Sequence, residues 1–236
     1  ILSWTANLSF SQLSECIHQA ERWPNSLSFQ WIYGDKIFAH AIGEVKDIYT
    51  EGVLINLLEK LPFTCNRIIN RVEDMNSLPN LSLGNNISHK STHSEVLGLL
   101  GPAWQDQNLK VLKIIKNLIE MRPNKSSYIA SQQLGGLTHS KDLDTSFIHR
   151  DAIWKPWING AWNAHDQSNR EETLKWMEEC WKNLEFICPG VHLAQIHPHL
   201  HWHQKELTLA FRDWLPKLQE IKAIHDPRNL MPPLNR

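Results

Sequence analysis

Net charge, cysteine and long hydrophobic runs are all scarce in this sequence, and each scarcity excludes a class of protein. The 24 Lys and Arg residues are balanced by 25 Asp and Glu residues. No basic surface that would neutralise phosphates is therefore expected, and nucleic acid is not expected as a partner. The longest uncharged apolar stretch, residues 96–104, is far shorter than the ~20 residues that cross a bilayer. We expect no membrane span.

Patterns that build nucleotide-binding and hydrolytic sites are missing as well. The sequence contains no GxGxxG and no GxxxxGK[ST], and it has neither GxSxG nor HExxH. Nucleotide binding by this chain alone is therefore not indicated. The four cysteines show no CxxC spacing and do not form a disulfide framework, so reduced and buried thiols are expected at Cys16, Cys65, Cys180 and Cys188.

Helical and extended patterns alternate along the whole chain. Apolar residues at intervals of three and four predict helices over residues 11–22, 50–61, 108–121, 169–184 and 206–224, the last with a kink at Pro216. Extended patterns predict strands over residues 27–33, 36–45, 64–72, 126–133, 144–150, 152–162 and 191–197, and Gly34-Asp35 is expected to close a hairpin. Residues 73–92 are expected to form a long irregular loop. We predict an α+β fold, an antiparallel β-sheet flanked by helices, in a single domain over residues 1–236.

The densest chemical feature is the run HPHLHWH, which places histidine at every second position. On a strand this spacing would put all four imidazoles on one face. One hypothesis is a transition-metal site formed by His197, His199, His201 and His203. The alternative is a polar strand end interrupted by Pro198, because no carboxylate or cysteine lies alongside in the sequence.

Two further groups of residues are candidates for a site. His149, Arg150 and Asp151 adjoin in TSFIHRD, where an Arg-Asp pair at a strand end is the alternative to a site. Gln133 is followed closely by Gly135 and Gly136, which would let the backbone approach a ligand or would form a plain turn.

Two stretches resemble a known family. QQLGGLTHSKDLDTSFIHRD is similar to the strand, Gly-Gly, loop and Thr-x-Phe-x-His-Arg pattern of FAD-linked oxidases related to berberine bridge enzyme. LPKLQEIKAIHDPRNLM is similar to the closing helix of that family and to its Lys-x-x-x-Asp-Pro-x-Asn-Leu motif, carried here by Lys222, Asp226, Pro227, Asn229 and Leu230.

The resemblance implies the substrate-binding, C-terminal half of a FAD-dependent oxidoreductase. In that family an alcohol- or amine-type substrate is oxidised by hydride transfer to the flavin. FAD would be held mainly by residues outside this chain, so the implied partners are a FAD-binding domain or subunit and a small-molecule substrate. The expected substrate- and flavin-facing residues are Gln133, Gly135, Gly136, His149, Arg150 and Trp214, with His197 as the catalytic base.

The chain also departs from the family pattern. Where the family commonly has Ala-Tyr-Val-Asn-Tyr, this chain has AQIHP, so His197 and Pro198 replace Asn and Tyr. Two alternatives therefore stand beside the oxidoreductase. One is a catalytically inactive descendant that serves as a protein-binding or scaffold module. The other is a histidine-rich metal-binding protein.

Overall fold

A computed structural model of the chain describes residues 1–72, 92–141, 145–228 and 230–231. An eight-stranded sheet runs through the described part, in the order β4-β1-β3-β2-β6-β7-β5-β8. The strands are β1 (Leu2–Leu8), β2 (Leu27–Tyr33), β3 (Ile37–Gly43), β4 (Cys65–Arg71), β5 (Thr92–Leu100), β6 (Tyr128–Gln133), β7 (Trp154–Asn163) and β8 (Gly190–Val191). Every neighbouring pair is antiparallel, which confirms the predicted α+β fold with an antiparallel sheet.

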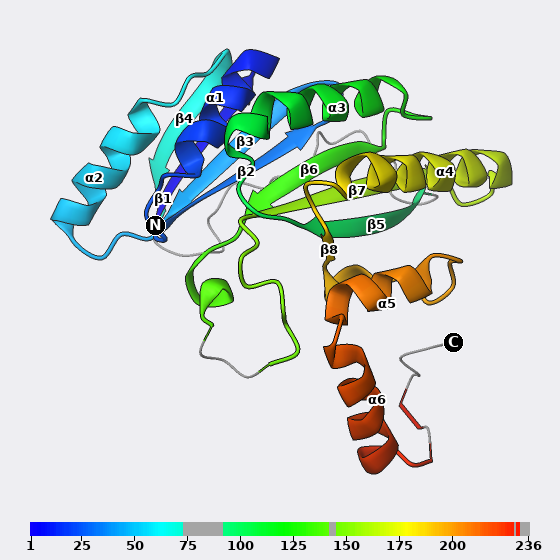
Figure 1. Cartoon of the computed structure of the whole chain (residues 1–236). Coiled ribbons are helices and arrows are strands. Elements are labelled where there is room, and N and C mark those ends of the chain that lie inside the picture. The colour runs from blue at the N-terminus through cyan, green and yellow to red at the C-terminus, as the bar shows by residue number, and fades with distance from the viewer. Residues whose placement is uncertain (73–91, 142–144, 229, 232–236) are drawn as a thin grey trace.

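Helices cover one face of this sheet (Figure 1). The helices on this side are α1 (Phe10–Ala20), α2 (Ile48–Glu59), α3 (Asn108–Glu120) and α4 (Gln167–Leu184). They confirm four of the helices expected from the sequence, with ends shifted by at most two residues. A capping box begins α1, because Ser9 accepts from the backbone of Gln12 while the Gln12 side chain accepts from the backbone of Ser9.

The core lies between the sheet and these helices. Alternate residues of the strands point toward the helices, among them Trp4 of β1 and Trp31 of β2, and both are fully buried. Leu13 of α1 and Leu112 of α3 pack into the same cluster. Because the strand period is two, the intervening residues of each strand must point to the other face of the sheet.

The N-terminal strand was not predicted. Residues 2–8 alternate in the manner of a strand, with Leu2, Trp4 and Ala6 in the core, but Ser3 and Thr5 between them are also buried, so burial does not alternate as it does in a half-exposed strand. The hairpin between β2 and β3 also differs from the prediction. Tyr33 pairs with Ile37, so the loop has three residues rather than the two expected.

Two other predicted strands are wrong. Residues 145–150 are not extended in a ladder, because Arg150 bonds the carbonyls of Leu137 and Thr138 and folds the segment back. Of the last predicted strand, residues 191–197, only Val191 lies in a strand, and a short 3-10 helix, η4 (Leu193–Gln195), and turns follow it. Pro198 has no N–H to contribute to a ladder there.

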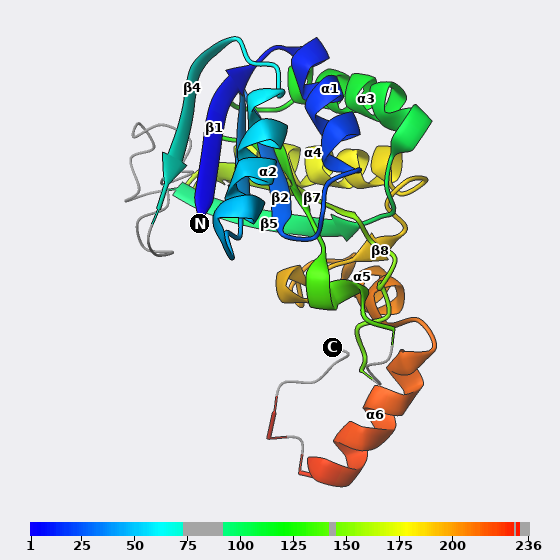
Figure 2. The same ribbon diagram turned by 90° about the vertical axis from the view of Figure 1, so that its left-hand side faces the viewer.

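The last predicted helix is two helices, α5 (His203–Phe211) and α6 (Trp214–His225). Arg212, with a φ of 46°, breaks the chain direction between them. Pro216 falls in the first turn of α6, where its missing N–H costs nothing, so the kink expected at that residue is absent. Helix α6 points away from the sheet and has no buried residue (Figures 1 and 2).

Other expectations concern thiols, membranes and the long loop. All four cysteines are free, and Cys16, Cys180 and Cys188 are buried as expected, whereas Cys65 is exposed. No helix in the described ranges has the length and apolar character that crossing a bilayer requires. Nearly all of the predicted loop, residues 73–91, lies outside the described residues, as does Asn229 of the closing motif.

Candidate functional site

The face of the sheet opposite α1, α3 and α4 carries a row of polar side chains, and we call it the second face. The strand register places one residue from each of five adjacent strands side by side, and the row is Thr5, His40, Gln30, Gln132 and Lys155. Residues that pair directly across antiparallel strands share a face and lie about 5 Å apart. The register therefore brings together residues that are up to 150 positions apart in the sequence.

A second row lies beside the first and is largely apolar. It consists of Asn7, Phe38, Ile32, Ala130 and Trp157. Phe38 and Trp157 are only partly buried and do not belong to the core under the helices. The second face thus combines aromatic surface with amide, imidazole and ammonium groups, which is typical of small-molecule sites.

Burial changes the acid–base properties of this face. Burial lowers the pKa of Lys155 and lowers the pKa of His40 to about 4. Among the described residues that the register places on the second face, none is Asp or Glu. Basic groups whose pKa is lowered without a neighbouring acid are the kind of group found in functional sites.

His40 predicts a pH dependence of stability. Its Nε2 lies 3.2 Å from the Ser3 hydroxyl, and its buried Nδ1 has no partner in the described part of the chain. The folded pKa of about 4 lies below the ordinary value of 6.5, so the unfolded state takes up the proton first as the pH falls. The stability from neutral His40 is complete above pH ~6.5, and roughly 1 kcal/mol should be lost per pH unit between pH 6 and pH 4. Urea unfolding at several pH values should show this slope, and His40→Asn should reduce it. An NMR titration that placed the pKa of His40 near 6.5 would contradict the expectation.

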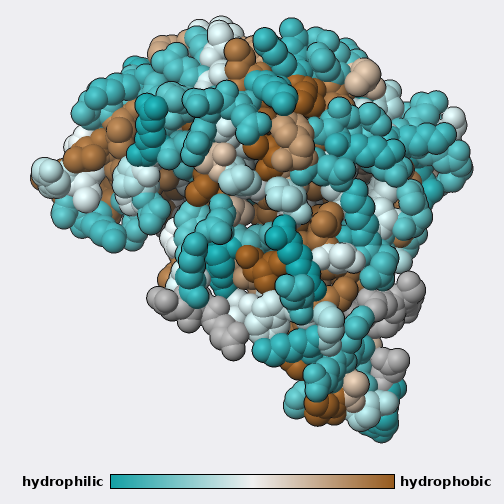
Figure 3. Space-filling view, viewed as in Figure 1, coloured by the Kyte–Doolittle hydropathy of each residue, from teal (hydrophilic) through white to brown (hydrophobic). Residues whose placement is uncertain are grey.

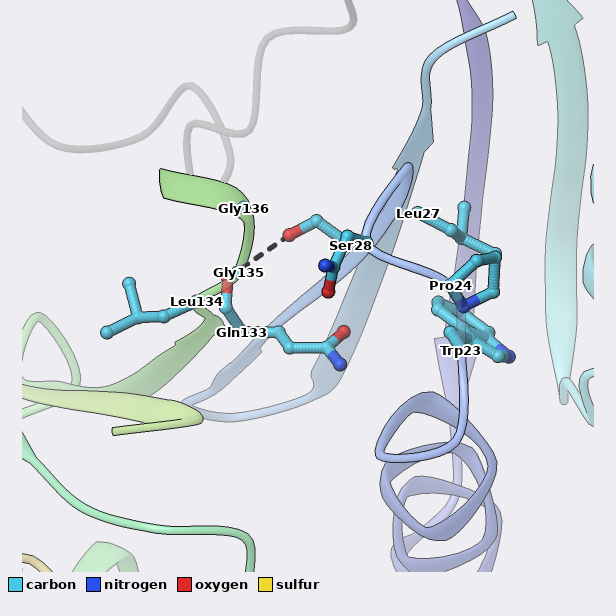
Figure 4. A pocket seen from close by; sticks show the side chains of 9 residues that line it. Trp23, Pro24, Leu27, Ser28, Gln133, Leu134, Gly135 and Gly136 are labelled. Carbon is cyan, nitrogen blue, oxygen red and sulfur yellow. Dashed lines mark hydrogen bonds between the residues drawn. The ribbon is translucent and has the colours of Figure 1, made fainter. Parts of the chain in front are cut away.

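Gln133 and the two glycines lie at the end of β6, beside a cavity of about 260 Å³ (Figure 4). The Gln133 side chain is engaged in the fold, since its amide donates to the Ala20 carbonyl and its oxygen accepts from the Phe29 N–H. Gly135 and Gly136 line the open part of the cavity, and Gly136 has a φ of 59°. The Ser28 hydroxyl, which donates to the Gln133 carbonyl, connects this cavity to the second face.

His149, Arg150 and Trp214 are not on the second face. His149 Nε2 lies 2.9 Å from the Leu209 carbonyl, and its ring lies against Gly190. Arg150 bonds two carbonyls of the loop after Gly136. Trp214 begins α6, with the Lys217 ammonium 3.9 Å from its ring centroid. The His149 contact joins the loop before β7 to α5, whereas the Arg150 contacts lie within the loops and the Trp214 contact lies within α6.

The histidine run does not form a strand and does not converge on one point. His197 is buried between two carboxylates, with Nδ1 2.6 Å from Glu206 and Nε2 3.4 Å from Glu95. His199 contacts Glu95, while His201 contacts Glu178 of α4. No group of three or more His, Cys, Asp or Glu within the described ranges is arranged to hold a metal ion. The described residues therefore give no support to the metal site predicted for His197, His199, His201 and His203. His197 and His199 share Glu95, whereas His201 faces Glu178.

The same geometry does not suit the catalytic role expected for His197. A general base needs a free nitrogen within hydrogen-bond reach of the substrate. Both ring nitrogens of His197 face carboxylates, and only 3% of the residue is exposed. His197 instead links α5 to β5 through its contacts with Glu206 and Glu95.

Sequence reasoning missed the polar row of the second face. Gln132 adjoins the predicted Gln133, and Lys155 lies inside a strand that was predicted correctly. The signal was the alternation itself, because Trp154, Ile158 and Trp162 occupy one face of β7 and leave Lys155 and Trp157 for the other. Strand order, which aligns them with Gln30 and Gln132, could not be read from the chain.

Comparisons with known proteins identify the fold. No protein-family model matches the chain, and no curated protein matches its sequence. Solved structures do match. One is Physcomitrella patens BBE-like 1, with a TM-score of 0.76 and 12% sequence identity, covering 100% of this chain and 54% of that one. The chain has the fold of the substrate domain of berberine bridge enzyme-like proteins.

Two further structures share this berberine bridge enzyme-like fold. CrmK, a flavoenzyme involved in shunt product recycling in caerulomycin biosynthesis, matches with a TM-score of 0.70 and 16% identity over 100% of this chain and 54% of its own. Berberine bridge enzyme matches with a TM-score of 0.67 and 15% identity over 99% and 55%. The chain thus spans about half the length of these proteins. The resemblance in fold that the two motifs implied is confirmed.

Proposed function

We propose that this chain is the substrate-binding half of a FAD-dependent oxidoreductase, which oxidises an alcohol- or amine-type substrate by hydride transfer to the flavin. The observation that carries the proposal is the polar row of the second face. It lies on a sheet whose fold is shared with FAD-linked proteins such as the flavoenzyme CrmK. A sheet that is covered by helices on one side and carries amides and a half-buried lysine on the other fits a substrate wall.

The residues present fit the reactive end of a flavin better than its diphosphate. The second face offers Trp157 and Phe38 as aromatic surface, and the Gln30 and Gln132 amides as hydrogen-bonding groups. The sequence has none of the glycine turns that hold phosphates. FAD would therefore be held mainly by a FAD-binding domain or subunit, and the cofactor, when bound, supplies the hydride acceptor.

The side chains of the row have distinct tasks in this proposal. Gln30 and Gln132 orient the substrate through hydrogen bonds. Lys155 places positive charge beside an oxygen of the substrate. Trp157 excludes water from the reacting carbon. His197 is not given a role in proton transfer here, because both of its nitrogens are engaged.

Helix α6 supports the presence of a partner. Its apolar side chains include Ile221 and Ile224, exposed to 42% and 64%, and brown side chains gather at that end of the molecule (Figure 3). A helix without a buried residue is stabilised mainly when its apolar face is covered. We propose that the FAD-binding portion covers it.

The proposal predicts a yellow protein. The complete gene product, purified from its source, should carry the visible absorption of an oxidised flavin, and this absorption should bleach under anaerobic conditions when substrate is added. Gln132→Leu should lower kcat/KM about 10- to 100-fold, because one hydrogen bond to the reacting group is lost. Gln204→Leu, on the exposed side of α5, is the matched control and should leave kcat/KM unchanged. A colourless gene product that takes up no FAD would end the proposal.

A protein-binding module without catalytic activity is the second candidate. The exposed apolar side chains of α2, among them Ile48 and Val53, favour it. Brown side chains lie on the side of the molecule away from α6 as well (Figure 3). The same purification separates the two candidates. A stable complex with another protein, and no flavin in either component, would support the binding module.

A further inference from the structure

One end of the second face holds polar atoms that have no partner. The segment after β8 crosses β5 at Gly98, where a Cβ atom would lie 2.0 Å from Gln195 Oε1 and 3.1 Å from His192 Cβ. Gly98 is therefore required for this close approach, and it pairs with Trp157 across the sheet. His192 and Gln195 therefore pack against the second face beside Trp157.

Each of these two partly exposed side chains has one buried polar atom without a hydrogen-bond partner in the described part of the chain. His192 Nδ1 and Gln195 Oε1 are both inaccessible to solvent and have no hydrogen-bond partner within the described residues. A buried polar atom without a partner costs about 1–3 kcal/mol. Both side chains lie over Gly98, so the two missing hydrogen bonds fall in one region of the second face.

The electrostatics of this place favour an anion. Burial lowers the pKa of His192, and the nearby charge of Lys155 lowers it further. Burial also lowers the pKa of Lys155, and no ion pair is formed by Lys155 with any described residue. The register assigns no Asp or Glu to this face in the described strands, so no carboxylate of those strands neutralises Lys155. An anion would relieve the cost of burying the Lys155 ammonium.

We propose that Lys155, His192 and Gln195 form a subsite for a substrate carboxylate, with Trp157 packing against the adjoining part of the substrate. The ammonium of Lys155 and the ring N–H of His192 donate to the carboxylate oxygens. Rotation of the Gln195 amide by half a turn presents its NH₂ to the same group. The inference rests on the proposed use of the second face as a substrate wall, and it names the substrate class as hydroxy acids or acidic sugars.

The test compares two sugars that differ only in the carboxylate. Calorimetric titration of the 236-residue chain with D-glucuronate and with D-glucose should show at least about tenfold tighter binding of D-glucuronate. Lys155→Met should remove this preference, while Lys155→Arg should keep most of it. Lys113→Met, at an exposed position of α3, is the matched control and should bind like the unaltered chain.

An NMR titration gives a second measurement that a purely structural role would not change. Bound D-glucuronate should raise the pKa of His192, followed through the imidazole signal that His192→Gln removes. Equal affinities for the two sugars, or binding of neither, would overturn the inference. A chain that prefers D-glucuronate but belongs to a gene product without flavin would keep the subsite and remove the oxidoreductase. A flavoprotein that shows no preference for D-glucuronate would keep the oxidoreductase and remove the subsite.

Discussion

Replacing Glu206 with alanine is expected to lower the free energy of unfolding by about 2–6 kcal/mol, because two buried N–H groups lose their acceptor at about 1–3 kcal/mol each. Glu206 is fully buried, and its oxygens lie 2.7 Å from the His197 backbone nitrogen and 2.6 Å from its Nδ1. Without the carboxylate, both N–H groups remain in the protein interior without an acceptor. Urea unfolding of the variant and the unaltered chain measures the difference.

Two variants make this prediction specific. Glu206→Gln keeps an acceptor oxygen at the same place and should lose less stability than Glu206→Ala. Glu178→Ala removes the carboxylate beside His201, a side chain that is 72% exposed, and should change the free energy of unfolding by less than about 1 kcal/mol. If Glu206→Ala were as stable as Glu178→Ala, the buried cross-link between α5 and β5 would not exist.

Trp154→Ala is expected to cost about 3–5 kcal/mol, the cost of removing a buried tryptophan from a packed core. Trp154 is fully buried, its ring lies 5.6 Å from that of Trp104, and its indole N–H donates to Glu21 over 2.6 Å. Glu21 also accepts from the backbone N–H groups of Trp104 and Gln105. Loss of the indole therefore leaves a cavity. It also removes the hydrogen bond by which Glu21, at the end of α1, is joined to β7.

Trp157→Ala is the matched contrast on the same strand. Trp157 lies on the second face and is only partly buried, so its removal should cost about 1 kcal/mol of stability. Trp157→Ala should nevertheless weaken sugar binding or turnover, whereas Trp154→Phe should leave both unchanged if the protein remains folded. Thermal unfolding of Trp154→Ala and Trp157→Ala compares their stabilities, and calorimetric titration of Trp157→Ala and Trp154→Phe compares their sugar binding. If Trp154→Ala and Trp157→Ala lost the same stability, the two faces of β7 would not differ as core and site.

Helices and most strands of this chain could be predicted because their signals are local. Residues 108–121 carry Leu112, Ile115 and Ile119 at helical spacing, and α3 forms there. The failures have physical causes that operate between distant residues. His197 is drawn toward Glu206 and Glu95 rather than into a ladder, and Arg150 bonds carbonyls of a neighbouring loop.

The candidate site shows the same division. Gln133 was predicted for the site, yet its amide is used to join β6 to Ala20 and Phe29. Its neighbour Gln132 faces the other side of the sheet and belongs to the polar row. A shift of one residue changes the face of a strand, and the sequence around β6 does not show which face the helices cover.

The order of residues alone determined the alternation of helices and strands, the absence of phosphate-binding turns and the resemblance of two motifs to FAD-linked oxidases. These properties depend on neighbours within a few positions, where spacing and side-chain type act directly. The tertiary structure decided which residues meet on the second face, that His197 is a buried cross-link, and that His192, Gln195 and Lys155 lie near one another. Those outcomes depend on strand order and on contacts between segments far apart in the chain, which no local pattern encodes.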